Sequence, residues 1–84
     1  MNISVPIYNK NNGFKFEWEN GFRLECEYDE YNTLIIKANS EGLISLARHL
    51  LEMSQVDVPS GTHIHLDESN SLTDGSNEII IEKL

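Results

Sequence analysis

Two histidines alternate with apolar residues in the segment His63-Ile64-His65-Leu66-Asp67, where residue type and spacing favour metal chemistry. If this segment is a strand, the two imidazoles point the same way with Cα atoms roughly 6.5–7 Å apart, close enough to share one ion. A zinc site needs three or four ligands, and the sequence places no further ligand beside this pair. We therefore keep a small metal-binding or hydrolytic domain as an alternative. The favoured interpretation is that His63 and His65 are surface strand residues paired with acidic neighbours.

Nucleophilic catalysis has no comparable signal. Cys26 lies on the apolar side of an alternating segment, and we expect it to be a small core residue. The chain contains no nucleophile elbow, no phosphate-binding glycine loop and no dinucleotide fingerprint. The sequence therefore indicates a binding protein without a cofactor rather than an enzyme.

Acidic side chains outnumber basic ones by 14 to 6, which gives the chain a formal net charge of −8. This charge repels nucleic-acid phosphates and anionic lipid surfaces, so we expect neither a nucleic-acid nor a membrane partner. The same charge steers a basic protein towards the chain, and this is the interaction that we predict. The alternative is that the charge serves only solubility.

The carboxylates fall into two groups, one within residues 17–30 and one in and beside the polar segment 67–77. Leu72 is the apolar exception in the second segment, and either it pins the loop to the core or it contacts a partner directly. The residues that we predict to bind a partner are Glu17, Glu25, Glu27, His63, His65, Asp67, Glu68, Leu72 and Asp74.

Alternation of apolar and polar residues predicts a β-hairpin in the first third of the chain. Residues 14–18 place three aromatic side chains on one side, and residues 22–28 alternate in the same way. Asn20-Gly21 between them is the residue pair best able to adopt positive φ at both central positions of a type I′ turn. We therefore expect these two segments to pair.

One amphipathic helix is predicted for residues 41–55. Asn39 and Ser40 precede it as N-caps, because their side-chain oxygens can accept hydrogen bonds from free amide groups. The apolar residues fall on one half of the helical wheel and should pack across a sheet, so we expect Leu50→Ala to cost about 2–5 kcal/mol. The other half of the wheel carries Ser45, Arg48, His49, Glu52 and Gln55.

Residues 1–84 are therefore expected to form a single α+β domain. Its small, mainly antiparallel sheet has about five or six strands in the order β-β-β-β-α-β-β, with the helix packed on one face. The remaining predicted strands are residues 2–8, an edge strand because of Pro6, and residues 33–38, 62–66 and 78–83. A single cysteine, no signal peptide and no apolar run of roughly 20 residues favour the cytoplasm.

Five segments of the second half carry a family resemblance: Gly42-Leu43-Ile44-Ser45-Leu46-Ala47, Val58-Pro59, His63-Ile64-His65-Leu66-Asp67, Asn70-Ser71-Leu72 and Glu78-Ile79-Ile80-Ile81-Glu82-Lys83. With these segments the C-terminal half resembles a family of small bacterial proteins known as immunity protein 32. The resemblance implies a cytoplasmic protein that binds a toxin of a polymorphic toxin system and blocks its active site or substrate surface. It implies no catalytic residues, and it marks His63, His65, Leu66 and Asp67 as a structural strand or as part of a toxin-facing surface.

The preferred function is therefore that of an immunity protein whose acidic surface engages a cognate toxin with a basic surface. Two rivals remain. One is the metal-binding or hydrolytic domain that uses His63 and His65. The other is a homodimeric structural subunit that buries an open sheet edge.

Overall fold

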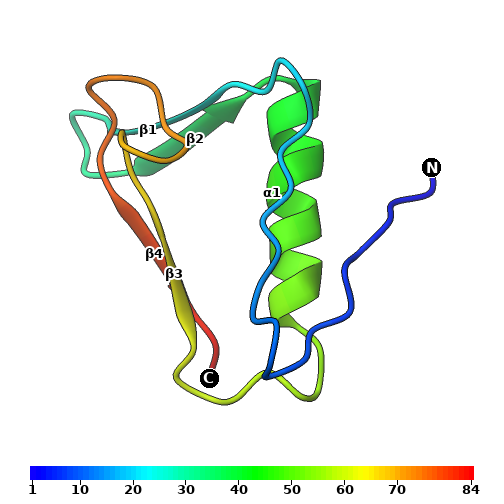
Figure 1. Cartoon of the computed structure of the whole chain (residues 1–84). Helices are drawn as coiled ribbons and strands as arrows, with labels where there is room; N and C mark the ends of the chain where they lie inside the picture. Colours follow the sequence, from blue (N-terminus) through cyan, green and yellow to red (C-terminus); the bar gives the residue numbers. More distant parts are fainter.

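The computed structural model describes all 84 residues and contains one helix and four short strands (Figure 1). In chain order these are β1 (Leu24–Tyr28), β2 (Leu34–Ala38), α1 (Ser40–Met53), β3 (His63–Leu66) and β4 (Ile79–Glu82). The strands form two separate antiparallel pairs, β1 with β2 and β3 with β4. The predicted α+β class is confirmed, but the single sheet of five or six strands and its strand order are wrong.

The first hairpin joins β1 to β2 and pairs Cys26 with Ile36 at its centre. Its connection is held by Asp29, whose carboxylate oxygen Oδ1 accepts hydrogen bonds from the backbone amides of Tyr31 and Thr33. Asn32 takes a φ of 61°, a left-handed conformation that asparagine tolerates better than most residues. The polar turn at Asp29 thus closes a hairpin between β1 and β2, which lie within the predicted strands 22–28 and 33–38.

Asn20 and Gly21 form a turn that does not reverse the chain into a hairpin. The Phe22 amide donates to the Glu19 carbonyl, and Gly21 has a φ of 80°. Asn32 is the only non-glycine residue with positive φ, so Asn20 lacks the conformation that a type I′ turn requires. Positive φ at the second central residue alone is typical of a type II turn. The predicted pairing of residues 14–18 with residues 22–28 is therefore wrong.

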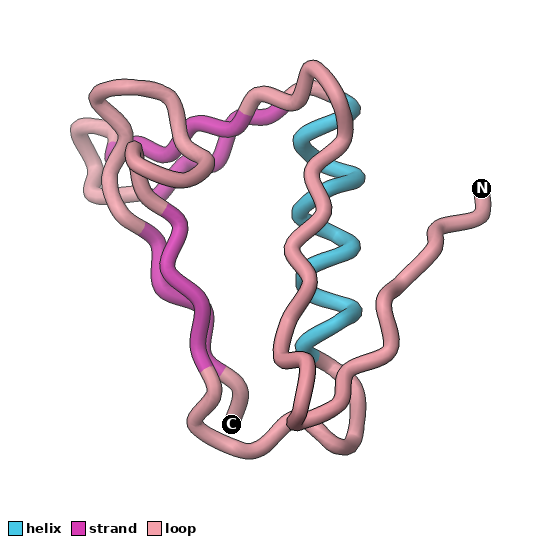
Figure 2. Tube along the Cα trace, viewed as in Figure 1, coloured by secondary structure: helices cyan, strands magenta, loops and turns pink.

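Residues 14–19 instead run as an extended segment along α1 (Figure 2). Residues 2–8, which the sequence predicted to be an edge strand, are also outside any regular strand. A turn closed by the Asn9–Gly13 bridge joins the two segments. We refer to residues 4–8 and 14–19 as the two N-terminal arms.

The helix begins as its cap residues predict. Asn39 is the N-cap, and its Oδ1 accepts hydrogen bonds from the amides of Gly42 at 2.8 Å and Arg23 at 2.9 Å. Its Nδ2 donates to the Gly21 carbonyl at 3.0 Å. One side chain therefore joins the helix start to the turn before β1. The helix ends at Met53, two residues before the predicted end.

The orientation of α1 is opposite to the one predicted from its amphipathic pattern. Its polar residues Ser45, Arg48, His49 and Glu52 are buried, whereas Leu43, Leu50 and Leu51 are 55%, 42% and 44% exposed. The reason is that the N-terminal arms bring unpaired backbone groups to the helix, and such groups need hydrogen-bond partners. The prediction that Leu50 belongs to the core of the chain is wrong.

Side chains of α1 form hydrogen bonds with backbone groups of the arms. The Lys15 amide donates to Glu52 Oε2 at 2.7 Å, and the Glu19 amide donates to Ser45 Oγ at 2.8 Å. Arg48 lies between the arms and donates from Nε to the Ser4 carbonyl, from Nη1 to the Glu17 carbonyl and from Nη2 to Glu19 Oε1. The buried polar side of the helix is therefore hydrogen-bonded at these positions.

The hydrophobic core receives residues from both hairpins, from the end of α1 and from the loop between β3 and β4. Its buried members are Leu24, Cys26, Met53, Ile64, Leu66 and Leu72. The predicted core position of Cys26 is confirmed, and burial, with a smaller contribution from the Glu27 carboxylate, raises the pKa of its thiol. Leu72 is 4% exposed, so it pins the loop to the core and is not available to contact a partner.

Candidate functional site

The loop between β3 and β4 docks along the free edge of β1. The Thr73 amide donates to the Leu24 carbonyl at 3.0 Å, and the Asn77 amide donates to the Cys26 carbonyl at 2.8 Å. Ser76 Oγ accepts in return from the Cys26 amide at 3.2 Å. The loop thereby links the two hairpins and carries its own charged residues to β1.

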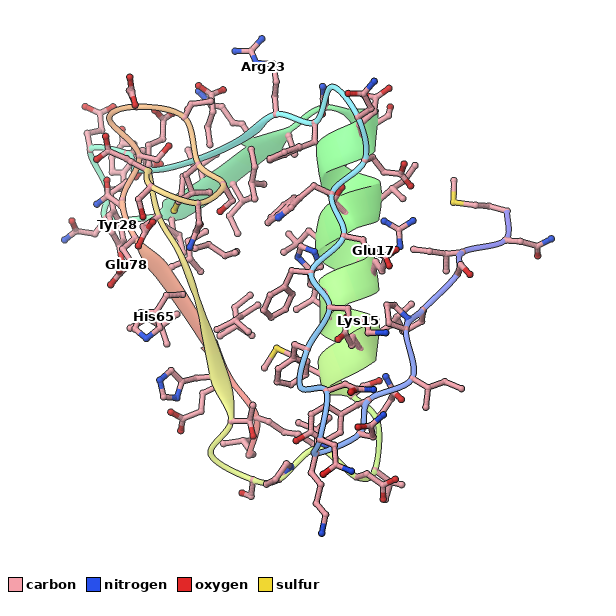
Figure 3. The ribbon with its side chains drawn as sticks, viewed as in Figure 1. Lys15, Glu17, Arg23, Tyr28, His65 and Glu78 are labelled. Atoms are coloured by element: carbon pink, nitrogen blue, oxygen red, sulfur yellow. The ribbon has the colours of Figure 1, made fainter.

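Carboxylates that are far apart in the sequence meet where the loop and β1 come together. Thr73 Oγ1 donates to Glu25 Oε1 at 3.4 Å, and the Gly75 amide donates to Glu68 Oε2 at 3.2 Å, which ties both groups of acidic residues to one end of the molecule. Figure 3 shows Glu78 beside Tyr28 at this end. We call this surface the acidic end, formed by Glu25, Glu27, Glu68, Asp74 and Glu78.

Basic groups compensate little of this charge. Lys37 Nζ lies 2.6 Å from Glu27 Oε1, an exposed pair in which the hydrogen bond to Glu27 raises the lysine pKa. His65 Nδ1 lies 3.8 Å from Glu78 Oε2, a contact that attracts only when the imidazole is protonated. The other three carboxylates of the acidic end have no basic side chain within ion-pair distance. The acidic end therefore keeps an excess of negative charge.

Glu17 does not belong to this surface. It lies on the second N-terminal arm beside α1, across the molecule from Glu78 and His65 (Figure 3). The sequence placed it with Glu25 and Glu27 because it predicted a hairpin between residues 14–18 and 22–28. Because that hairpin does not form, the carboxylates of the arm and of β1 are separated.

His63 and His65 are exposed on β3, as predicted, with their ring centroids 5.1 Å apart. No group of three or more histidine, cysteine, aspartate or glutamate side chains is placed to hold a metal ion. Asp67 instead shapes the loop, since its Oδ1 accepts from the Ser69 amide at 2.9 Å and from the Ser69 hydroxyl at 2.6 Å. The hydroxyl hydrogen bond is the main cause of the lowered pKa of the Asp67 carboxyl. Asp67 is thus engaged within its own loop.

A cleft of about 380 Å³ lies next to the acidic end, between β3 and the second N-terminal arm. Its lining residues are Phe14, Phe16 and Trp18 from the arm, Ile64 and Leu66 from β3, and the polar residues His63, His65 and Asn70. The sequence did not predict this cleft, because the alternating aromatic residues indicated the inner side of a hairpin. Their spacing was the available signal, but it does not say what lies opposite them.

His49 packs behind the aromatic wall of the cleft and is fully buried. Its ring centroid lies 4.3 Å from that of Trp18 and 5.0 Å from that of Phe16, with both pairs edge-on. Neither ring nitrogen has a hydrogen-bond partner. Burial lowers the pKa of His49, the nearby Arg48 charge acts in the same direction, and a backbone contact with Glu17 opposes the shift.

The sequence model of one protein family, immunity protein 32, matches residues 33–84 of the chain. The chain belongs to this family. No curated protein sequence and no solved structure matches the chain significantly. The helix of this immunity protein 32 family member is too short and too polar to cross a bilayer.

The match to the immunity protein 32 family divides the site unevenly. It covers β2, α1, β3, β4 and the loop between the last two strands, and so includes Glu68, Asp74 and Glu78 of the acidic end. The two carboxylates on β1 and both N-terminal arms lie outside the matched residues. The arms therefore contribute one wall of the cleft from a part of the chain that the family description does not reach.

Proposed function

We propose that this immunity protein 32 family member neutralises a cognate protein toxin by binding it through the acidic end. The observation that carries the proposal is the family match over residues 33–84. That stretch holds three of the five carboxylates of the acidic end, together with both histidines of β3. The proposed mechanism is occlusion of the toxin's active site or substrate surface and involves no reaction on this chain.

Electrostatic steering supports the choice of this surface. Three of its carboxylates have no basic side chain within ion-pair distance, and the whole chain carries a net charge of −8. Complementary charge raises the association rate more than it raises the affinity itself. A toxin surface that holds negatively charged substrate groups would present the positive charge that these carboxylates attract.

The neighbouring cleft offers a source of binding free energy that exposed charges alone do not provide. Exposed ion pairs contribute little binding free energy, whereas an apolar or aromatic side chain buried in a pocket is a typical binding hot spot. Asn70 connects the cleft to the loop, because its Nδ2 donates to the His65 carbonyl at 2.8 Å and its Oδ1 accepts from the Asp67 amide at 3.1 Å. We therefore propose that the toxin places an apolar side chain in the cleft while its basic groups face the acidic end.

Neutralising the acidic end tests this proposal. A triple variant, Glu27→Gln with Glu68→Gln and Asp74→Asn, keeps side-chain size and hydrogen-bonding oxygens while removing three charges from exposed positions. Its association rate with the cognate toxin domain should fall about tenfold or more at low salt. Surface plasmon resonance at several salt concentrations measures the rate, and growth of cells that express the toxin measures protection.

The matched control removes the same number of charges elsewhere. Glu17→Gln with Glu41→Gln and Asp57→Asn changes three exposed carboxylates outside the acidic end, and we expect a smaller loss in association rate. Equal losses in the two triple variants would mean that net charge, and not this surface, governs the association. Failure of wild-type protein to bind or protect against the toxin domain would overturn the proposed function as a whole.

A further inference from the structure

The edge of β3 that faces away from β4 presents open backbone groups. The Lys83 amide donates to the Thr62 carbonyl at 2.8 Å, so these two residues form a hydrogen-bonded pair directly before β3. Hydrogen-bonded pairs alternate with open pairs along an antiparallel ladder, which places His63 and His65 in open pairs. The backbone amides and carbonyls of both histidines therefore point away from β4.

The chain itself bonds this edge at one end only. Asn70 Nδ2 donates to the His65 carbonyl at 2.8 Å, in agreement with a carbonyl that points away from β4. No other loop or side-chain group forms a hydrogen bond with the amides of His63 and His65 or with the His63 carbonyl. These groups are spaced along an extended strand, so the backbone of another extended segment matches them.

The other two outer edges carry exposed charges, whereas β3 does not. Lys37 lies on β2 and Glu82 on β4. Charged side chains, lysine above all, keep an edge strand from pairing with another chain. β3, with the sequence His63-Ile64-His65-Leu66, contains no lysine, arginine, aspartate or glutamate. Its edge is therefore the one best suited to accept a further strand.

The cleft lies beside this edge. Ile64 and Leu66 of β3 line one side of it, and the aromatic residues Phe14, Phe16 and Trp18 line the other. Side chains alternate between the two faces of a sheet, so every second residue of a strand added to β3 points to the same side as Ile64 and Leu66. Those side chains enter the cleft, where Phe16 is still 42% exposed.

The opposite face of the β3–β4 pair is acidic. His65 points away from α1 (Figure 3), and its Nδ1 lies 3.8 Å from Glu78 Oε2. Glu82 stands opposite His63 in the register of the two strands. The residues of an added strand that do not enter the cleft lie on this face, so the two carboxylates favour basic side chains there. Because Glu78 belongs to the acidic end, this face continues that surface.

We propose that the toxin binds through an extended segment that adds a third strand to the free edge of β3. Its backbone forms hydrogen bonds with His63 and His65, and its apolar side chains enter the cleft at every second position. Basic side chains between them face Glu78 and Glu82. The inference rests on the proposed function and adds the conformation and sequence pattern of the partner segment. In this binding mode main-chain hydrogen bonds supply affinity, and the pocket for alternate side chains supplies specificity.

Amide hydrogen exchange of the wild-type protein, followed by NMR, tests the added strand. The His63 and His65 amides should exchange quickly in the free protein, and the cognate toxin domain should slow their exchange about tenfold or more. A complex that leaves both amides unprotected would overturn strand addition while the proposed function stands. Absence of any complex would overturn both. Protection in the free protein that grows with its own concentration would assign the edge to a second copy and overturn the toxin strand.

Proline substitution tests the same edge through affinity. His63→Pro removes an open amide at an edge position, where a strand tolerates proline. Ile80→Pro is the matched control, because Ile80 is exposed, pairs with His65 and presents its amide to the outer edge of β4. We expect His63→Pro to weaken toxin binding about tenfold or more and Ile80→Pro to weaken it much less.

Thermal unfolding shows whether both proline variants fold, and if His63→Pro does not, the exchange measurement decides. His63→Thr removes the same imidazole but keeps the amide, and it should bind more tightly than His63→Pro. Equal losses in these two variants would mean that the ring, and not the backbone, contacts the toxin, which would overturn the added strand. Equal losses in His63→Pro and Ile80→Pro would do the same.

Discussion

At the scale of single residues, His49 is a polar side chain that lies in surroundings without hydrogen-bond partners for it. It is fully buried between Phe16 and Trp18, and both of its ring nitrogens lack hydrogen-bond partners. A buried polar group without a partner costs roughly 1–3 kcal/mol. The fold tolerates this cost because the ring completes the packing behind the aromatic wall of the cleft.

Replacing His49 with leucine should therefore preserve stability or raise it by about 1 kcal/mol at neutral pH, since the substitution removes the unpaired nitrogens and keeps an apolar body of similar size. The pH dependence should change as well. Burial lowers the folded-state pKa below the ordinary value of 6.5, so the unfolded chain takes up a proton more readily than the folded one. Relative to His49→Leu, the wild type should keep its free energy of unfolding above pH 6.5. It should lose stability as the pH falls from there towards the folded-state pKa.

Urea unfolding of both proteins across this pH range measures the difference. The general change in net charge on acidification affects wild type and His49→Leu alike, so the difference between their two curves isolates the histidine. Parallel curves would mean that His49 is protonated equally in the folded and unfolded states. A large loss of stability in His49→Leu at neutral pH would mean that the contact between the ring and the Glu17 backbone contributes more than the unpaired nitrogens cost.

At the scale of elements, the start of α1 is positioned by backbone contact as well as by its cap. A Cβ added to Gly42 would lie 2.2 Å from the carbonyl oxygen of Arg23 and 3.1 Å from the Ala38 Cβ. The Arg23 carbonyl also accepts a hydrogen bond from the Asn39 amide. The first turn of the helix is therefore in direct contact with the backbone that leads into β1.

Gly42→Ala should destabilise the protein by about 1–3 kcal/mol, because the added methyl group must push the helix away from this backbone. The expected sign is opposite to that of the same change in an exposed helix interior, where alanine is favoured over glycine by about 1 kcal/mol. Thermal or urea unfolding measures the effect. Glu41→Ala at the neighbouring exposed position is the control and should shift stability by about 0.5 kcal/mol or less. A higher melting temperature for Gly42→Ala would contradict the close contact.

Local signals predicted the elements well and their assembly poorly. The Asn39 cap, the helix and the strands at residues 34–38, 63–66 and 79–82 follow from features within a few positions of each other. Asn20-Gly21 suits a type II turn as well as a type I′ turn, so the sequence alone did not decide whether the chain reverses there. The orientation of α1 depended on that decision, because the arms bring the backbone groups that its polar side binds.

The candidate site shows the same division. Composition alone identified segment 67–77 as acidic. It left two alternatives for Leu72, an anchor in the core or a contact for a partner. The docking of Thr73 and Asn77 on β1, which brings the two acidic groups together, is a long-range contact with no local signature. Glu17 was misplaced and the cleft was missed for the same reason. The alternation of aromatic and polar residues in segment 14–18 does not say which part of the chain lies opposite it.

At the scale of the whole molecule, charge is distributed unevenly over an elongated body of 41 × 27 × 24 Å. Like charges gathered at one end destabilise the folded state through mutual repulsion, and dissolved salt screens that repulsion over a Debye length of about 10 Å at 0.1 M. Toxin association, as proposed, depends on attraction between the same carboxylates and basic groups of the toxin, and salt screens this attraction too. Salt should therefore have opposite effects on the free chain and on the complex.

Adding sodium chloride to the free protein should raise its stability by about 1 kcal/mol, which corresponds to about 4–8 °C in Tm for a domain of this size. Calorimetry at a series of salt concentrations measures the gain. The triple variant that neutralises Glu27, Glu68 and Asp74 should start from a higher Tm and gain less, because part of the repulsion is already removed. A Tm that falls with salt would indicate that the pairs Lys37–Glu27 and Arg48–Glu19 contribute more than the repulsion does.

The attachment of the N-terminal arms has a consequence for how sequence change is tolerated. The helix and Gln55, which follows it, hold them mainly by main-chain atoms. These are the carbonyls of Ser4, Pro6 and Glu17 and the amides of Tyr8, Lys15 and Glu19. Every residue type supplies these atoms, apart from the amide that proline lacks. Exposed side chains of the arms, including Phe16 at the cleft, can therefore be exchanged without breaking the hydrogen bonds that hold the arms to the helix.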